Sequence, residues 1–365
     1  MTTDLFDCSS TPSLANSRPR ILTTHPKGFH PLWTAQTVLL PGWLDEANRT
    51  QGRPISLFRS LYWGWKLFRT SRNFDVVVTA FERSWHVFTL MNSLLRRDKR
   101  RHIFVFVNLT LPTGVRSPWL KRWYYRQIIM AAERTVVFSR RQVEMYAHAL
   151  GAPAGKFVCV PYHSTIGNDS TNGGTPKYRL SEGDYIFAGG DSNRDYGPLI
   201  EAVRHLPHRV VIAARSSNHF RSLKIPANVE ILTVDPEDFF RLMAGAKVVV
   251  VPVRGGLLQG GQQTYLNAMA MGKPVVVADD TGADEYIIQG HTGLVVPPGD
   301  PIGLRRALLS VLGNDEFGRA LGRAAKNAAP RYSLDRFIEG VMSIICDVDS
   351  KTKASTSLTR FDSRI

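Results

Sequence analysis

Residues 247–278 read KVVVVPVRGGLLQGGQQTYLNAMAMGKPVVVA, and this stretch decides the fold. Two continuous runs of β-branched residues, Val248–Val251 and Val275–Val277, stand on either side of a glycine-rich loop and a helix-length segment. Apolar runs without alternation are typical of strands buried on both faces, as in parallel sheets covered by helices. The stretch therefore predicts a strand, loop, helix and strand of an α/β fold.

The same rhythm recurs along the chain in two sets, separated by a polar, glycine-rich break at residues 163–183. We expect strands at 21–24, 75–79, 102–107, 134–138 and 157–160, and then at 185–188, 209–213, 229–232, 247–251 and 274–278. The 365 residues exceed the length at which a single core stops growing, about 250–300 residues. The predicted fold class is α/β, with two doubly wound, Rossmann-like domains in tandem.

The two strand sets and the polar segments set the predicted boundaries. They are a disordered N-terminal tail at 1–18, a first domain at 19–162, a linker at 163–183, a second domain at 184–330, a C-terminal helix at 331–348 with the possibility of crossing back to the first domain, and a disordered tail at 349–365. The tails are predicted because such polar segments cannot bury enough apolar surface to offset the entropy lost on ordering.

Composition narrows the class of protein. Hydrophobic residues make up 43% and charged residues 21% of the chain, as in ordinary globular proteins. Cys8, Cys159 and Cys346 have no metal-ligand spacing, so neither zinc nor disulfides are expected. No secretory signal and no apolar run long enough to span a bilayer is recognisable, and we expect a cytoplasmic protein.

Positive charge is concentrated in the first half of the chain. Residues 1–157 carry 23 Lys and Arg against 9 Asp and Glu, a formal net charge of +14, whereas residues 158–365 carry only +1. The distribution matters more than the total of +15. If the protein meets an anionic surface, we expect the first domain to meet it.

Ligands of open α/β sheets bind at the carboxyl ends of strands, where the next helix presents free N–H groups. The loop after residues 185–188 contains Gly189, Gly190 and Arg194. Glycines allow close approach of the backbone to a ligand, and the arginine fork suits phosphate oxygens. The alternative is a plain turn in which Arg194 pairs with Asp191 or Asp195 on the surface.

A second loop, at residues 254–264, contains four glycines directly before a helix. Such a loop can cradle a phosphate with backbone N–H groups, here those of Gly260, Gly261, Gln262 and Gln263. Gln259 adds a neutral amide that can hydrogen-bond hydroxyl groups. Leu266, Met269 and Ala270 have helical spacing and are interpreted as core residues.

A third loop, at residues 279–285, is acidic. Its Asp279 and Asp280 are compatible with a metal site or with general-acid carboxylates. Thr281 and Asp284 are residue types that cap helix N-termini, and we favour capping.

Two stretches resemble a known family. QGGQQTYLNAMAMGKPVVVADDTGADEYIIQGHTGLVVPPGDPIGLRRAL, residues 259–308, resembles the donor-site region of glycosyltransferase family four, and FAGGDSNRDYGPLIEAV, residues 187–203, resembles the start of that family's C-terminal domain. The resemblance is specific over about residues 185–330 and only architectural over the first 160. It implies the GT-B fold, in which two Rossmann-like domains face a central cleft, and a hexosyltransferase-like reaction that retains configuration.

The resemblance also implies site residues. The family has two glutamates separated by seven residues, for the donor sugar and the ribose, and Gln259 and Asn267 occupy those places here. The family's arginine and lysine near the diphosphate are replaced by Asp191 and Arg194. Arg194 and Gln259 are thus the predicted catalytic residues, and the predicted donor-binding residues are Gly189, Gly190, Arg194, Gln259, Gly260, Gly261, Gln262, Gln263, Thr264 and Asn267.

Replacement of carboxylates by amides is compatible with catalysis in such a site. An amide oxygen still accepts hydrogen bonds from hydroxyls, at a cost of about 1–2 kcal/mol. The family's same-face mechanism, assisted by the leaving phosphate, requires no protein nucleophile. The protein would stabilise charge on the departing diphosphate with Arg194 and the loop N–H groups. We expect no metal and no other cofactor.

Two basic, aromatic segments lie in the first domain. Helical spacing puts Leu57, Leu61 and Phe68 on one stripe and Arg59, Trp63, Lys66 and Arg69 on another, and Trp119, Arg122 and Arg126 are interleaved in the second segment. Such mixtures suit an anionic lipid interface, with Arg59, Trp63, Lys66, Trp119, Arg122 and Arg126 as predicted membrane contacts. The alternatives are core aromatics with solvated cations, or nucleic-acid binding, for which no motif is present.

The predicted function is transfer of a sugar from a nucleotide-sugar to a saccharide or lipid-linked acceptor, in the cytoplasm at the inner membrane face. A polysaccharide pathway is a plausible setting. No nucleic acid is expected as a partner. The alternative is a catalytically silent GT-B protein that binds a nucleotide-sugar and acts as a partner or regulator, with Gln259 and Asn267 as marks of lost activity.

Overall fold

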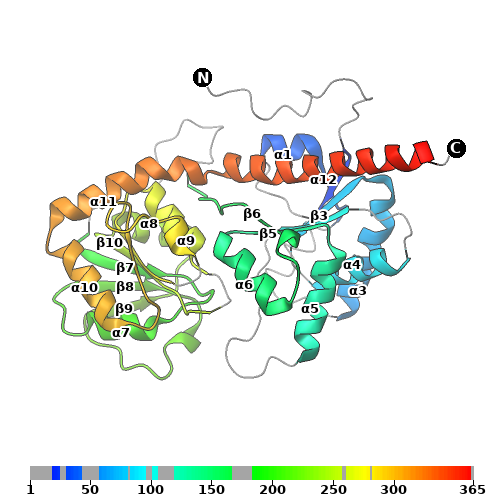
Figure 1. Cartoon of the computed structure of the whole chain (residues 1–365). Coiled ribbons are helices and arrows are strands. Elements are labelled where there is room, and N and C mark those ends of the chain that lie inside the picture. The colour runs from blue at the N-terminus through cyan, green and yellow to red at the C-terminus, as the bar shows by residue number, and fades with distance from the viewer. Residues whose placement is uncertain are drawn as a thin grey trace, which may run out of the picture.

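The structure is a computed structural model of the 365-residue chain. It describes residues 19–24, 30–42, 57–80, 83–95, 101–105, 119–166, 183–256, 260–279 and 282–362. Within these ranges the chain forms two α/β domains, each built on a six-stranded sheet, and a long C-terminal helix that extends from one domain over the other (Figure 1).

Domain 1 contains a fully parallel sheet in the order β2-β1-β3-β4-β5-β6. Its strands are β1 (Ile21–Thr23), β2 (Thr37–Leu39), β3 (Val76–Ala80), β4 (Arg101–Val105), β5 (Arg134–Val137) and β6 (Phe157–Cys159). Its helices are α1 (Pro31–Gln36), α3 (Leu57–Thr70), α4 (Arg83–Leu95), α5 (Trp119–Ala131) and α6 (Arg140–Leu150), with short 3-10 turns at Ser71–Asn73 and Ala154–Lys156.

Domain 2 contains a second parallel sheet in the order β12-β11-β10-β7-β8-β9. Its strands are β7 (Tyr185–Gly189), β8 (Arg209–Ala213), β9 (Val229–Leu232), β10 (Val248–Pro252), β11 (Val275–Ala278) and β12 (Leu294–Val296). Its helices are α7 (Tyr196–Val203), α8 (Pro236–Gly245), α9 (Gln262–Ala270), α10 (Pro301–Leu312) and α11 (Asp315–Ala328), with 3-10 turns η4 (Ser217–His219), η5 (Ala283–Glu285) and η6 (Ala329–Tyr332).

Alternating side chains of the domain 2 strands enter two hydrophobic layers. Val248 and Val250 pack with residues of α7 and α10, whereas Val249 and Val251 pack with residues of α8 and α9. All four valines are fully buried, which explains their continuous run in the sequence. The predicted fold class is confirmed. The short strands β2 and β12, absent from the expected set, extend each sheet at one edge.

Strand order locates a binding edge. Seen from β7, the next strands in the chain, β8 and β9, are added on one side of the sheet. The later strands β10, β11 and β12 are added on the other side. In such sheets the helices leave on opposite faces at the point of reversal, and a crevice opens at the carboxyl ends of the two strands. That point lies between β7 and β10.

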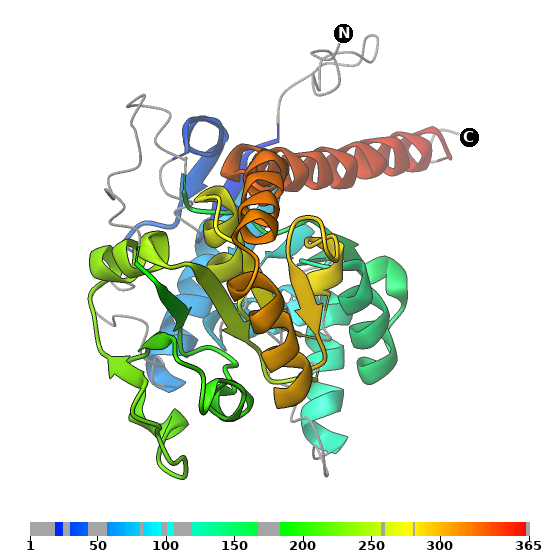
Figure 2. The ribbon, with the colours of Figure 1, turned by 90° about the vertical axis from the view of Figure 1, so that its left-hand side faces the viewer.

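The C-terminal helix α12 (Leu334–Asp362) belongs structurally to domain 1. Its Phe337, Ile338 and Val341 share one buried cluster with Ile21 and Val76 of the domain 1 strands. The His30 ring and the Asp335 carboxylate are joined by a 2.6 Å hydrogen bond. Figures 1 and 2 show the helix leaving domain 2 and lying along domain 1. The last part of the chain therefore completes the core of the first domain.

The expected tails and the expected linker have different outcomes in the structure. Residues 349–362 continue α12 as a helix, so the sequence-based expectation of a disordered tail there was wrong. A helix already anchored by tertiary packing can extend through residues that would not form one alone. The expected N-terminal tail, 1–18, and most of the expected linker lie outside the described residues.

A polar seam joins the domains near the cleft. The Tyr286 hydroxyl of domain 2 accepts a hydrogen bond from the Tyr162 N–H at 2.8 Å and donates one to the Phe138 carbonyl. The Glu285 carboxylate accepts from the N–H groups of Arg140 and Arg141, at 2.8 and 2.9 Å. These N–H groups begin helix α6, where a carboxylate also complements the helix dipole.

Replacement of the Tyr286 hydroxyl tests the seam. We expect Tyr286→Phe to lower the free energy of unfolding by about 1–3 kcal/mol, because it removes the hydrogen bonds to a partly buried carbonyl and a partly buried N–H. Urea unfolding followed by circular dichroism measures the change. Tyr62→Phe, at an exposed tyrosine of α3, is the control and should have no effect. Equal stability of both variants would contradict a structural role for the hydroxyl.

Candidate functional site

A pocket of about 690 Å³ opens at the carboxyl ends of β7, β8 and β10, at the point where the strand order reverses. Domain 2 contributes most of its wall, and Phe138, Tyr162 and Thr165 contribute from the domain 1 side of the crossing. The domain 2 residues that line it are Gly190, Asp191, Ser192, Arg194, Ala213, Ala214, Arg215, Val234, Asp235, Pro236, Phe239, Phe240, Gly260, Gly261, Gln262, Gln263, Thr264 and Asn267.

Most of the predicted donor-binding residues meet in this pocket. Gly189 does not line the pocket but lies behind its wall, where an added Cβ would clash with the Phe239 ring. Gln259 lies outside the described residues, so its predicted catalytic and donor-binding roles stay predictions. The other eight predicted residues form one continuous part of the wall.

Arg194 is a buried residue of the pocket floor, with a relative exposure of 4%. Its Nε donates to the Gly189 carbonyl at 3.0 Å and its Nη1 to the Ser192 carbonyl at 2.7 Å. Its Nη2 donates to Thr264 Oγ1 on helix α9 at 2.9 Å. The side chain thus ties the loop after β7 to the start of α9. The alternative in which Arg194 pairs with Asp191 or Asp195 on the surface was wrong.

The acceptors of Arg194 are carbonyl and hydroxyl oxygens, and no carboxylate of the described residues lies within ion-pair distance. Burial lowers the pKa of its guanidinium, since a charge is disfavoured away from water. A buried charge without an ion partner is costly. The floor of the pocket therefore holds positive charge that an anionic ligand would neutralise.

The glycines of the pocket are required by close packing of its two loops. Gly190 and Gly261 have φ of +103° and +87°, values that favour glycine. A Cβ on Gly260 would lie 2.8 Å from the Ser192 carbonyl oxygen. Because the loops touch at these points, the glycines hold Arg194 between them.

Helix α9 begins at the pocket without a side-chain cap. Its N-cap is Gly261, which has no side chain to accept from the first-turn N–H groups. Gln262, Gln263 and Thr264 form that first turn and line the pocket. Uncapped N–H groups and the positive end of the helix dipole favour anions, and here they lie next to the buried guanidinium.

Asn267 is almost fully buried, at 1% exposure, and is tied to the chain crossing from domain 1. Its Oδ1 accepts from the Ser164 hydroxyl and the Thr165 N–H, both at 2.8 Å. Its Nδ2 donates to Thr165 Oγ1 at 3.0 Å. An amide can both accept and donate, which a carboxylate cannot. The structure thus gives Asn267 a linking function, and its ribose-binding role stays a prediction.

The acidic loop at residues 279–285 stabilises its own turn and contributes to the polar seam between the domains. Asp279 Oδ2 accepts from the Ala283 N–H at 2.9 Å, so Asp279 holds the turn that starts η5. Asp284 pairs with the Arg141 guanidinium at 2.8 Å. The N-cap position of η5 is Gly282, which has no side-chain cap, so the interpretation of Asp284 as a capping residue was wrong. Asp280 and Thr281 lie outside the described residues.

A different side of helix α3 faces the domain 1 core from the side that the sequence predicted. Trp63 is buried at 6% exposure, so its assignment as a membrane contact was wrong; it packs in the domain 1 core with Leu67 and Phe68. The exposed large side chains of α3 are Leu57, Phe58, Leu61, Tyr62 and Trp65, with Phe58 at 83%. Apolar residues occupy both stripes of this helix, so spacing alone did not fix which stripe faces the core.

The other predicted surface residues differ in exposure. Arg59 and Arg122 are exposed, whereas Lys66 and Arg126 are half-buried. Arg122 and Arg126 donate to the carbonyls of His148 and Gly151 at the end of α6, each at 3.1 Å. Trp119 is exposed at 77%, and Trp123, which was not among the predicted contacts, is also exposed. Domain 1 thus presents aromatic side chains on both α3 and α5.

Sequence reasoning missed the wall formed by β8 and β9. Ala213 ends β8 and Ala214 and Arg215 follow it, while Val234 and Pro236 follow β9. The rule that ligands bind at carboxyl ends of strands pointed to these loops, but neither is rich in glycine.

Truncation of Arg194 tests its structural role. We expect Arg194→Ala to lower the free energy of unfolding by about 3 kcal/mol or more, since it leaves buried carbonyls without donors and opens a cavity. Chemical denaturation measures the change, with Arg254→Ala, an exposed arginine of the neighbouring loop, as control. If both variants are as stable as the wild type, the three hydrogen bonds do not support the fold.

Comparisons with known proteins agree with this geometry. Residues 186–314 match the family model described as "Glycosyl transferases group 1". An uncharacterized glycosyltransferase of Methanocaldococcus jannaschii is 28% identical over 102 residues, 28% of each chain. The D-inositol 3-phosphate glycosyltransferase of Corynebacterium diphtheriae is 30% identical over 140 residues, 37% of this chain and 32% of that enzyme. The matched segments thus span about a third or less of these relatives.

Solved structures match over nearly the whole chain. HepE of Anabaena, crystallised with UDP and glucose, has a TM-score of 0.68 at 14% identity and covers 90% of this chain and 100% of that one. Sucrose-phosphate synthase from Thermosynechococcus elongatus has a TM-score of 0.63 at 15% identity, over 86% and 84% of the two chains. At such identities the likeness concerns the fold. The resemblance inferred from residues 187–203 and 259–308 is confirmed: the second domain matches the group 1 glycosyl transferases over residues 186–314, and the chain has the GT-B fold of its structural neighbours.

Proposed function

We propose that this protein transfers a sugar from a nucleoside diphosphate sugar to an acceptor, with retention of configuration. The observation that carries the proposal is the buried guanidinium of Arg194, which pairs with no described carboxylate, beside the start of helix α9, which no described side chain caps. Both groups attract a diphosphate, and both lie in the pocket at the reversal point of the sheet.

The diphosphate would occupy the wall formed by the two glycine loops. Each Nη of Arg194 has two protons and uses one in the described hydrogen bonds, so a second N–H remains for a phosphate oxygen. First-turn N–H groups of Gln262 and Gln263 add donors. These groups are fixed before the bond to the sugar breaks, and they would stabilise the charge that develops on the leaving diphosphate.

The nucleoside would extend along the edge toward β9. Val234, Pro236 and Phe239 make that end of the pocket apolar, as a nucleobase requires. The HepE structures contain UDP, which makes UDP the first probe for this chain.

The acceptor would enter from domain 1, whose strand ends face the same cleft. We propose that it is a saccharide, plausibly lipid-linked, reached at the inner face of a membrane. The support is the excess positive charge of residues 1–157 together with the exposed rings of α3 and α5. Aromatic side chains settle at headgroup depth and cations attract anionic lipids. Among the described residues, no helix is both long enough and apolar enough to cross a bilayer.

A catalytically silent protein that binds the same donor is the second candidate, because Gln259 and Asn267 replace two glutamates of the family. The ties of Asn267 to Ser164 and Thr165 show why an amide at that place can serve another purpose, which leaves Gln259 as the informative position. Release of nucleoside diphosphate from UDP-sugars by wild-type protein and by Gln259→Glu distinguishes the two. Turnover only in the variant would support the silent protein.

Calorimetry with UDP, GDP and ADP tests the donor site. We expect at least one of them to bind far more tightly than its nucleoside, because the site is built around the diphosphate. Gly261→Val should abolish binding, since valine cannot adopt a φ of +87° without strain and its side chain would meet Val251. Gly290→Val, at a glycine whose surroundings are open, controls for the strain of a positive φ alone. Wild-type protein that binds none of the three nucleotides would contradict the proposed site.

Sedimentation with vesicles tests the membrane surface. We expect the protein to bind phosphatidylglycerol vesicles at low salt and to dissociate as salt rises, because screening shortens the Debye length from about 10 Å at 0.1 M to about 3 Å at 1 M. Replacement of Phe58, Trp65 and Trp119 by Ser should weaken binding, whereas Ile302→Ser, at an exposed isoleucine of domain 2, should not. Wild-type protein that stays in the supernatant at low salt would exclude this surface as a membrane contact.

A further inference from the structure

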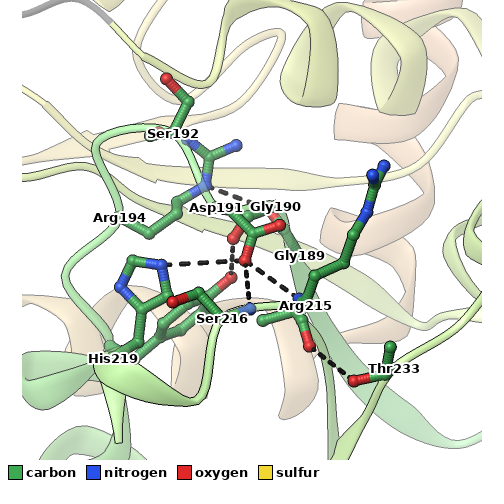
Figure 3. A network of polar contacts seen from close by, with 11 residues as sticks. Gly189, Gly190, Asp191, Ser192, Arg194, Arg215, Ser216, His219 and Thr233 are labelled. Carbon is green, nitrogen blue, oxygen red and sulfur yellow. Dashed lines mark hydrogen bonds and ion pairs between the residues drawn. The ribbon is translucent and has the colours of Figure 1, made fainter. Parts of the chain in front are cut away.

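Asp191 stands in the phosphate-facing loop at a place where the family has an arginine, yet it lines the pocket proposed for a diphosphate. Its carboxylate is engaged with the backbone of the next strand's loop. Asp191 Oδ1 accepts from the N–H groups of Arg215 and Ser216, both at 3.0 Å, and His219 Nε2 lies 3.8 Å away (Figure 3). The carboxylate thus fixes the turn that follows β8.

The side chain of Arg215 enters the pocket from this turn. Figure 3 shows it extended away from the Asp191 carboxylate. Arg215 is exposed and lines the pocket, and its guanidinium forms no hydrogen bond or ion pair with another described residue. A permanently charged fork without a partner is therefore presented to the site.

The sheet register places Arg215 level with the phosphate-facing loop. Gly189 of β7 pairs with Ala213 of β8, so Asp191 and Arg215 each follow their strand by two residues. Neighbouring strands are about 4.8 Å apart. The backbone of Arg215 therefore lies about one strand spacing from the loop that contains Arg194. The two glycine loops lie on one side of Arg215, and the apolar end of the pocket lies on the other.

We propose that Arg215 is a phosphate-binding residue that supplies the cation missing at position 191, and that Asp191 is its positioning residue. The inference rests on the proposed nucleotide site. Arg194 is fixed in the floor by its three hydrogen bonds, whereas Arg215 is able to close on the phosphates from the open side. The carboxylate of Asp191 is compatible with a bound diphosphate because its Oδ1 already accepts from two backbone N–H groups.

Binding of UDP, UMP and uridine to Arg215→Ala tests the contact by calorimetry. We expect the affinity for UDP to fall about 10- to 100-fold, the affinity for UMP to fall less and the affinity for uridine to be unchanged, since a charge-assisted hydrogen bond to phosphate is lost. Arg215→Lys should recover part of the loss. Arg221→Ala, at an exposed arginine outside the pocket, is the control. Equal losses for UDP and uridine, or UDP affinity equal to that of the control, would overturn the proposal.

Two variants of Asp191 separate positioning from charge. Asp191→Asn retains an oxygen that accepts from both N–H groups, and we expect UDP affinity close to wild type. Asp191→Ala releases the turn and should weaken UDP binding, with no further loss when Arg215 is already alanine, because both residues act through one contact. If the carboxylate only repels phosphate, both single variants bind UDP more tightly, and the positioning role is overturned.

Failure of the inference differs from failure of the proposed function. When wild-type protein binds UDP, GDP or ADP but Arg215→Ala binds the same ligand equally well, the nucleotide site stands and Arg215 is excluded. When the wild type binds none of the three, the nucleotide site fails and the role of Arg215 fails with it.

Discussion

The buried guanidinium of Arg194 is the constraint on which the organisation of the pocket depends. Two of its three hydrogen bonds stay within the end of β7 and the loop that follows, the third reaches Thr264 in the first turn of α9, and a Cβ on Gly190 would lie 2.8 Å from its Nη2. Hydrogen bonds between Asn193 and Arg254 join the same two loops, and Arg194 adds a charged link to the start of α9. The charge that organises the loops is also the charge that makes the pocket attractive to an anion.

The domains are held by contacts that lie close to this pocket. Tyr286 and Glu285 bind the strand end and helix start of domain 1, and Asn267 binds the crossing segment at Ser164 and Thr165. Each uses a backbone group at the end of a strand or helix, where regular structure leaves N–H and carbonyl groups unpaired. Helix α12 adds an apolar connection to domain 1 through Phe337, Ile338 and Val341. Movement of one domain against the other must therefore act on residues that also line or border the cleft.

Two departures from the family have structural counterparts. The amide of Asn267 donates as well as accepts, which suits a link between domains. The carboxylate of Asp191 accepts two backbone N–H bonds, which an arginine could not do. In both cases the substituted residue has taken up contacts within the protein. A residue that departs from a family pattern is thus better interpreted by what it now binds than by what it has lost.

The sequence by itself determined the class of fold and the position of the donor loops. Continuous valine runs can be buried only as central parallel strands, and glycines before a helix mark the phosphate-facing turn, so both are local consequences of residue type. Tertiary structure decided which side of α3 faces the core, because its two stripes are both apolar and only the neighbouring helices choose between Trp63 and Trp65. It also decided that Arg194 is buried and Arg215 is exposed. Each arginine follows a strand of the same sheet, and only the folded arrangement places Thr264 of α9 beside Arg194 and solvent beside Arg215. The partners of Asn267 and the path of α12 over domain 1 depend on contacts between residues far apart in the chain, which residue spacing does not encode.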